Sequence, residues 1–218
     1  MTSSALLDLR RSGAASETPP ARPVLAAVPD AVVRAEPDAV PGLVRELISR
    51  WTGHGAEIVS WLRPGVPAED LAEAAERFPA LARADLRAWW SAFDGVDPCE
   101  SGDHHHLPTV GPGAWVPLCL SRAIHLSTAV ASLAEARLLP VFIRDGEVLA
   151  VRADDAGSDT VVEVGIEDGD QDFEAPFAVL LSAWVDALSG SVTWNDGAQD
   201  WLSDAFAIDA APRPELVS

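Results

Sequence analysis

Three stretches in the first half of the chain, residues 41–55, 66–81 and 83–95, repeat apolar side chains at helical spacing. Apolar positions that recur every three to four residues are typical of a helix with one buried face. The first two stripes consist of Leu43, Leu47, Ile48 and Trp51, and of Leu71, Ala74, Ala75 and Phe78. We therefore predict a helix in each of the three stretches.

The third stretch, RADLRAWWSAFDG, is rich in aromatic side chains. At about 100° per residue, Trp89, Trp90 and Phe93 fall within an arc of about 100°, so that even the adjacent tryptophans can share one buried face. We expect Trp90 to lie between this helix and a sheet. Gly95 is the expected stop at the C-terminal end of the helix.

From residue 115 the pattern changes to short β-rich runs. WVPLCL at 115–120 predicts a short strand, and residues 138–155 predict two strands joined at Asp145-Gly146, which is a strong hairpin signal. Residues 160–168 alternate valine and isoleucine with polar side chains, which indicates a third paired strand.

Helical patterns return around these strands. Residues 127–138 predict a helix, and residues 176–190 predict an amphipathic helix that opens at Pro176 and stops at Gly190. The segment GAQDWLSDAF at 197–206 is compatible with one last short helix.

This order of elements indicates the fold class. Helices followed by strands and a final helix predict an α+β domain, with the N-terminal helices and the C-terminal helix against one side of one sheet. We expect an antiparallel or mixed sheet of about four to six strands. The domain spans residues 41–208, between a disordered Ala/Pro/Ser-rich arm at 1–40 and a disordered tail at 209–218.

Charge narrows the range of partners. The formal net charge is −19, and the fifteen basic residues are all arginine. From Asp145 to Asp209 there are sixteen acids and a single base, Arg152. Such a field repels nucleic acid and anionic lipid and attracts basic proteins.

The N-terminal segment and the two cysteines indicate the cellular location of the protein. The N-terminal segment lacks the apolar core of a signal peptide, and no apolar run reaches the length of a membrane span. The two cysteines, Cys99 and Cys119, form no CxxC pair. We expect a cytoplasmic protein without a disulfide framework.

The segment CESGDHHHLP at 99–108 gathers potential metal ligands in a predicted loop. Neighbouring side chains of an extended chain point to opposite sides, so that His104 and His106, with Asp103, are the candidates for one ion. A metal-dependent hydrolase centred on these residues is one hypothesis. The plain solvated loop is the other interpretation, and we predict no cofactor.

Other catalytic signatures are missing from the sequence. There is no GxSxG, P-loop, GxGxxG or HExxH motif, and there is no lysine. DGDQDFE resembles the start of a calcium loop, but Phe173 occupies the position that requires glycine. We predict that the protein is not an enzyme.

Five segments together resemble the SUKH superfamily, in the branch of the Smi/Knr-type cell-wall assembly regulators. They are LRPGVPAEDLAEAAERF, ADLRAWWSAFDG, LLPVFIRDGEVLAVRADD, VVEVGIEDG and PFAVLLSAWVDALSGSVTW, within residues 43–195. The resemblance implies a non-catalytic binding fold. Bacterial members are similar to immunity proteins that neutralise secreted toxins, and fungal relatives resemble regulatory hubs.

Charge and resemblance together predict a protein-binding surface for a basic partner, such as a toxin domain. Its predicted residues are Asp154, Asp155, Asp168, Asp170, Asp172 and Glu174. Asp154 and Asp155 follow a predicted strand, where capping of backbone amides is the alternative role. A scaffold role in a cytoplasmic assembly is a further hypothesis, and the oligomeric state is open.

Overall fold

The computed structural model describes residues 39–96, 109–110, 115–167, 169, 171–190, 192–195 and 200–203. Side chains are described for all of these except 171–173, 192, 200, 202 and 203. The chain divides into residues 1–30 and residues 31–218, and every described residue belongs to the second unit. Most of the predicted arm and the whole predicted tail lie outside the described residues.

The three helices predicted in the first half of the chain are all present. They are α1 (Val40–Gly53), α3 (Ala68–Arg77) and α4 (Ala84–Ala92), with the short α2 (Ile58–Trp61) and the 3-10 helix η2 (Pro79–Ala82) between them. The stripe that predicted α1 is buried at Leu47 and Trp51, both fully inaccessible. Helix α1 packs on α4 and on the C-terminal helix α7 (Phe177–Ser189).

The predicted end of the third helix at Gly95 is wrong. Helix α4 ends at Ala92, and β2 (Phe93–Val96) follows at once and pairs antiparallel with β1 (Leu62–Pro64). Gly95 has a φ of +62°, and a Cβ atom there would lie 2.4 Å from the carbonyl carbon of Leu118. Glycine is therefore needed for a close backbone approach within β2, and not as a helix stop.

The boundaries predicted between residues 115 and 138 also need correction. Strand β3 is limited to Val116–Pro117, and α5 (Leu120–Ala129) begins inside the predicted strand. A short α6 (Ala131–Glu135) follows, so the predicted helix at 127–138 is two helices. Asp94 on β2 explains the early start, because its Oδ1 accepts a hydrogen bond from Leu120 N at 2.7 Å. This bond satisfies a backbone donor in the first turn of α5.

The central sheet is antiparallel and five-stranded, in the order β3-β4-β5-β6-β7. Its longer strands are β4 (Leu138–Arg144), β5 (Glu147–Arg152), β6 (Thr160–Gly165) and β7 (Gln171–Pro176). The predicted hairpin joins β4 to β5, and Asp145 and Gly146 both have positive φ, as a tight hairpin turn requires. The α+β prediction is confirmed, while β7 was not predicted because its acidic sequence reads as a loop.

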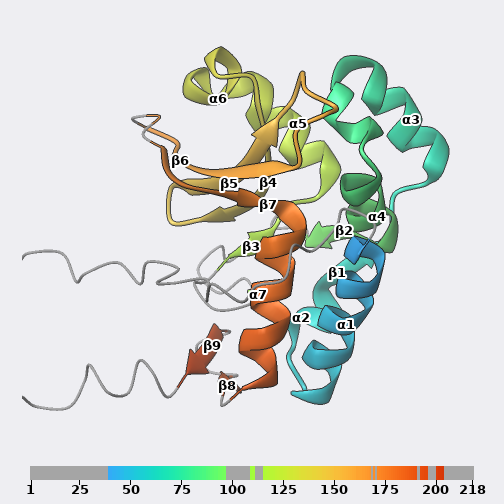
Figure 1. Ribbon diagram of the computed structural model, residues 1–218, viewed down its shortest axis with the longest axis vertical. Helices are drawn as coiled ribbons and strands as arrows, with labels where there is room; N and C mark the ends of the chain where they lie inside the picture. Colours follow the sequence, from blue (N-terminus) through green and yellow to red (C-terminus); the bar gives the residue numbers. More distant parts are fainter. Residues whose placement is uncertain are drawn as a thin grey trace, which may run out of the picture. The chain divides into compact units, whose positions relative to one another are not determined.

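The N-terminal helix α4 and the C-terminal helix α7 cover one face of this sheet, as predicted, and α5 and α6 cover the other. Residues 148–151 of β5 are all fully inaccessible, although successive side chains of a strand point to opposite faces. On one face, the ring of Phe142 meets Trp89 of α4, at 5.0 Å between centroids, and Trp184 of α7, at 4.9 Å. Figure 1 shows α5 and α6 on the other side of the sheet from α7.

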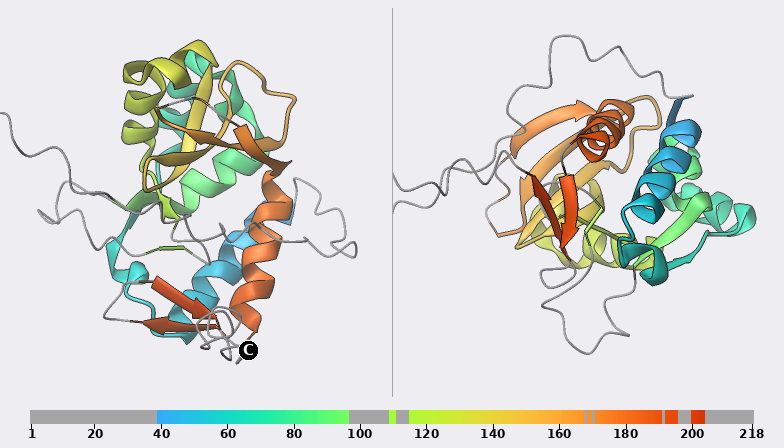
Figure 2. Two further views of the ribbon diagram at one scale, coloured as in Figure 1. Left: turned by 90° about the vertical axis from the view of Figure 1, so that its left-hand side faces the viewer. Right: turned by 90° about the horizontal axis from the view of Figure 1, so that it is seen from below.

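The C-terminal part contains one confirmed helix and one corrected element. Helix α7 runs between Pro176 and Gly190, as predicted. The segment predicted as a last short helix holds β9 (Asp200–Ser203), which pairs with β8 (Val192–Asn195) as a hairpin beside the end of α7 (Figure 2). Trp194 and Trp201 meet edge to face across the hairpin, with 5.1 Å between ring centroids, and such a cross-strand aromatic pair favours strands over a helix.

Candidate functional site

Two neighbouring turns at one end of the sheet carry exposed acidic side chains. Ile166 N donates a hydrogen bond of 2.8 Å to Gly146 O, so the end of β6 is tied to the β4–β5 hairpin. The residues next to this bond are Asp145 and Glu167, and both side chains are exposed. We call residues 144–147 and 165–167 the acidic turn pair.

Arg144 forms ion pairs with Glu147 of the acidic turn pair and with Glu163 on β6. Arg144 Nη2 lies 2.5 Å from Glu147 Oε2 and 3.0 Å from Glu163 Oε1. Its guanidinium also lies over the Trp115 ring, 4.2 Å from the centroid. Asp145 and Glu167 form no ion pair with any residue in the described part of the chain. These two carboxylates are therefore the exposed acids of the turns that no described cation pairs with.

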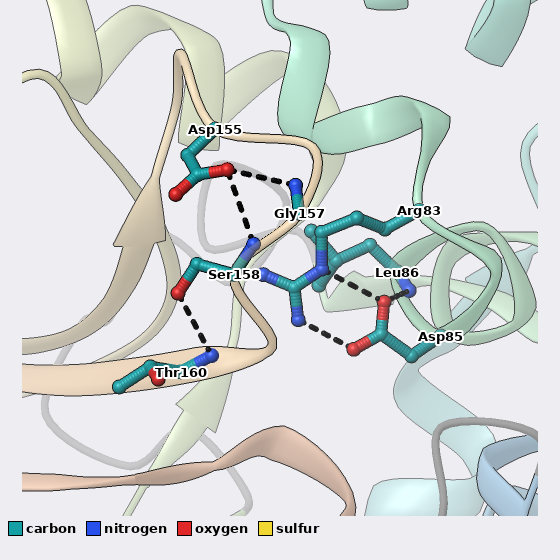
Figure 3. A network of polar contacts seen from close by, with 7 residues as sticks. All are labelled: Arg83, Asp85, Leu86, Asp155, Gly157, Ser158 and Thr160. Atoms are coloured by element: carbon teal, nitrogen blue, oxygen red, sulfur yellow. Dashed lines mark hydrogen bonds and ion pairs between the residues drawn. The ribbon is translucent and has the colours of Figure 1, made fainter.

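Asp154 and Asp155 lie where β5 leaves the sheet, at the opposite end of β5 from the acidic turn pair. Asp155 Oδ1 accepts hydrogen bonds from Gly157 N at 2.7 Å and Ser158 N at 3.1 Å (Figure 3). The amide-capping alternative is thus confirmed for Asp155. Asp154 instead forms an ion pair with Arg137, with 2.9 Å between Oδ2 and Nη1.

Among the six predicted acids, the structure describes the side chains of Asp154, Asp155 and Glu174, which come from the end of β5 and from β7, with β6 between these two strands. Strand β6, about 17 Å long, separates the turn of Asp154 and Asp155 from Glu167. Glu174 is exposed on β7, opposite Val162. Asp168 and Asp170 lie outside the described residues, as does the side chain of Asp172.

Asp145 and Glu167 were not among the predicted site residues. The Asp145-Gly146 turn was predicted from the sequence. The position of Glu167 beside this turn follows from the pairing of β5 with β6, which sets Glu147 opposite Gly165. To predict from the sequence that these two acids are neighbours, the register between β5 and β6 would have to be known.

Arg137 lowers the pKa of Asp154, and this predicts a measurable effect. The hydrogen bond from the Arg137 side chain is the largest cause, and the charges of Arg137 and Arg152 add to it. The carboxylate form is favoured, so the small stabilisation it brings is present above about pH 4 and is lost as the pH falls through the lowered pKa. In a carboxyl-detected NMR titration, we expect Asp154 to titrate below its usual value.

The variant Arg137→Gln should return the pKa of Asp154 towards the usual value, while Arg87→Gln, which changes an exposed arginine of α4, should leave it unchanged. An Asp154 pKa that is the same in all three proteins would show that the ion pair does not persist in solution.

The histidines and cysteines that are described have structural surroundings. His54 ends α1, and its Nε2 lies 2.9 Å from Leu188 O, with its ring edge-on to Trp201. Cys119 is buried, and His125 is exposed on α5. Within the described ranges, no three His, Cys, Asp or Glu side chains are placed to hold a metal ion. Asp103, His104 and His106 lie outside those ranges.

Two comparisons with known proteins found no match for this chain. No protein-family model matches it, and a search of curated proteins found no match. Across the described ranges, no helix is both long enough and apolar enough to cross a membrane.

Proposed function

We propose that the chain is a non-catalytic protein-binding domain, and that a basic protein docks on its acidic side. The observation that carries the proposal is the acidic turn pair. Asp145 and Glu167 are exposed and lack a cationic partner in the described structure, although fourteen other acids lie between Asp145 and Asp209. A basic surface would place cations beside these two carboxylates.

The acidic turn pair suits recognition because its backbone is held in place. The hydrogen bond from Ile166 N to Gly146 O joins the two turns, and Arg144 links Glu147 on β5 to Glu163 on β6. Charges fixed on a rigid scaffold lose little conformational entropy when a partner binds. The long-range field of the acidic strands would also speed the encounter with a cationic protein.

The resemblance to the SUKH superfamily supports a more specific form of the proposal. In that form the domain acts in the cytoplasm as an immunity or regulatory protein, and its partner is a basic toxin domain. The partner to test is the C-terminal domain of a secreted protein encoded beside this gene. Co-expression of the two proteins should restore the growth that the partner alone prevents.

Charge neutralisation should slow association with that partner. We expect the double variant Asp145→Asn/Glu167→Gln to lower the association rate several-fold at low salt, because steering depends on the local field. The dissociation rate should change less. For the wild type, association should slow steeply as salt shortens the Debye length to about 8 Å at physiological strength. Stopped-flow mixing over a salt series measures both effects.

The matched control is Glu73→Gln/Asp186→Asn, which removes the same two charges from exposed positions on α3 and α7. It should associate at nearly the wild-type rate. Equal slowing by both double variants would mean that bulk charge, and not the acidic turn pair, attracts the partner. Stoichiometric zinc in protein purified without a metal column would instead favour the hydrolase hypothesis.

A further inference from the structure

A hollow of about 430 Å³ opens where α3, α5 and α6 meet the start of β4 and the end of β5. Figure 1 shows these three helices at the same end of the fold. Its lining includes Arg77, Phe78, Ser127, Arg137, Ala153 and Asp154. The volume falls in the usual range for small-molecule sites. The hollow lies at the opposite end of the β4–β5 hairpin from the acidic turn pair.

Backbone hydrogen bonds fix the floor of the hollow. Ala153 N donates to Arg137 O at 2.7 Å, and Ala80 N donates to Ala153 O at 3.1 Å. These bonds join η2, the residue after β5 and the residue before β4. Arg137 has a φ of +53°, an uncommon value for a residue with a side chain. The surroundings thus hold the Arg137 backbone in a defined conformation at the rim.

The hollow has excess positive charge in a chain whose net charge is −19. Arg77 and Arg137 both line it, and Asp154 is the one acid in its lining. Asp154 is paired with Arg137, whereas Arg77 has no acidic partner among the residues that the structure describes. The Arg77 guanidinium lies 5.7 Å from the Phe78 ring centroid. One cation is therefore left without a counter-charge beside the hollow.

Ser127 adds a hydroxyl to the lining of the hollow. Its side chain lines the hollow and is 6% exposed, yet its hydroxyl forms no hydrogen bond with any described group. The neighbouring hydroxyl of Thr128 is already used, since it donates to the carbonyls of Ile124 and His125. A hydroxyl that lines the hollow can donate a hydrogen bond to a ligand there.

We infer that this hollow binds a small organic monoanion, a carboxylate with a short apolar body. The carboxylate meets the Arg77 guanidinium, which matches it in a two-bond geometry, and accepts a hydrogen bond from the Ser127 hydroxyl. Its carbon body lies against the apolar lining from Phe78, Ala134 and Ala153. A single uncompensated cation matches one negative charge better than the two charges of phosphate. This binding activity goes beyond the proposed function.

The test is an amide NMR titration of the full-length chain with benzoate, butyrate and inorganic phosphate at constant ionic strength. We expect saturable shifts for benzoate and butyrate, centred on the amides of Ser127, Arg137 and Ala153. Phosphate should bind more weakly than either carboxylate. Shifts that grow linearly without saturation, or phosphate binding tighter than benzoate, would overturn the inference.

Variants identify the groups that hold the anion. Arg77→Gln should weaken benzoate binding about tenfold, the usual size for a charged hydrogen bond, and Ser127→Ala about fivefold. Both replacements are small, and thermal unfolding of each variant confirms that it folds. Arg122→Gln on α5 changes an exposed arginine outside the lining and should leave the affinity unchanged. Equal weakening by Arg122→Gln would show that the carboxylate responds to general positive charge only.

Discussion

Replacing Trp89 with alanine is expected to lower the free energy of unfolding by about 3–5 kcal/mol, as deletions of large buried aromatic side chains do. Trp89 is fully inaccessible. Its ring lies edge-on to Phe93 at 4.5 Å, Phe142 at 5.0 Å and Phe177 at 5.7 Å between centroids. These rings come from β2, β4 and α7, so one side chain joins the helical half of the domain to the sheet.

Urea unfolding followed by far-UV circular dichroism measures this loss. The control is Val59→Ala on α2, because Val59 is 37% exposed and its removal should cost well under 1 kcal/mol. Trp89→Phe should cost less than Trp89→Ala, since it keeps an aromatic ring and removes an indole Nε1 that is buried without a described hydrogen-bond partner. A Trp89→Ala protein as stable as the control would show that the aromatic contacts do not hold the layers together.

Local periodicity was enough to predict this core helix but not its end. The expected burial of Trp90 is confirmed, and Trp89, on the same predicted face, meets the sheet at Phe142. Phe93 continues the helical stripe in the sequence, yet its backbone is extended and pairs with Pro64. Pairing with a strand about thirty residues away overrides the helix propensity of this segment. The spacing of apolar residues within the helix cannot reveal such a distant partner.

The start of α5 shows the same limit. Its first turn is held by the Asp94 carboxylate, which accepts from Leu120 N across 26 positions of sequence. Sequence signals for a helix start lie in the residues next to the helix, so they could not predict a start that depends on a distant carboxylate. The break at Val130, whose backbone is extended, likewise divided one helical pattern into α5 and α6.

The candidate sites depended even more on contacts that are distant in sequence. Asp155 caps amides two and three residues ahead, and this role was predicted as an alternative from its place after a strand. Asp145 and Glu167 came together only through the pairing of β5 with β6. Arg77 and Arg137 line one hollow although sixty positions separate them. Charge counts along the chain predicted acidity but not its division between two ends of the sheet.

Breaking the buried ion pair of Arg83 and Asp85 should be as damaging as removing Trp89. The two side chains are 5% and 3% exposed. Arg83 Nε and Nη2 donate to the two carboxylate oxygens of Asp85 at 3.0 and 2.5 Å, and Leu86 N donates to Oδ1 at 2.8 Å (Figure 3). Asp85→Ala leaves a guanidinium buried without its counter-charge, and we expect a loss of about 3–5 kcal/mol.

A double variant separates the contribution of the ion pair to stability from the cost of leaving one buried charge without its partner. Arg83→Met/Asp85→Leu removes both charges and keeps apolar volume, so it should recover most of the stability lost in Asp85→Ala. Recovery should be incomplete, because Leu86 N loses its acceptor in the first turn of α4, where a carboxylate also favours the helix dipole. Arg83 Nη1 is already buried without a described partner, so removing the guanidinium relieves a cost that the native fold carries. Urea unfolding of the wild type, Asp85→Ala and the double variant measures these stabilities. A double variant less stable than Asp85→Ala would mean that the ion pair itself, and not the avoidance of an isolated buried charge, stabilises the start of α4.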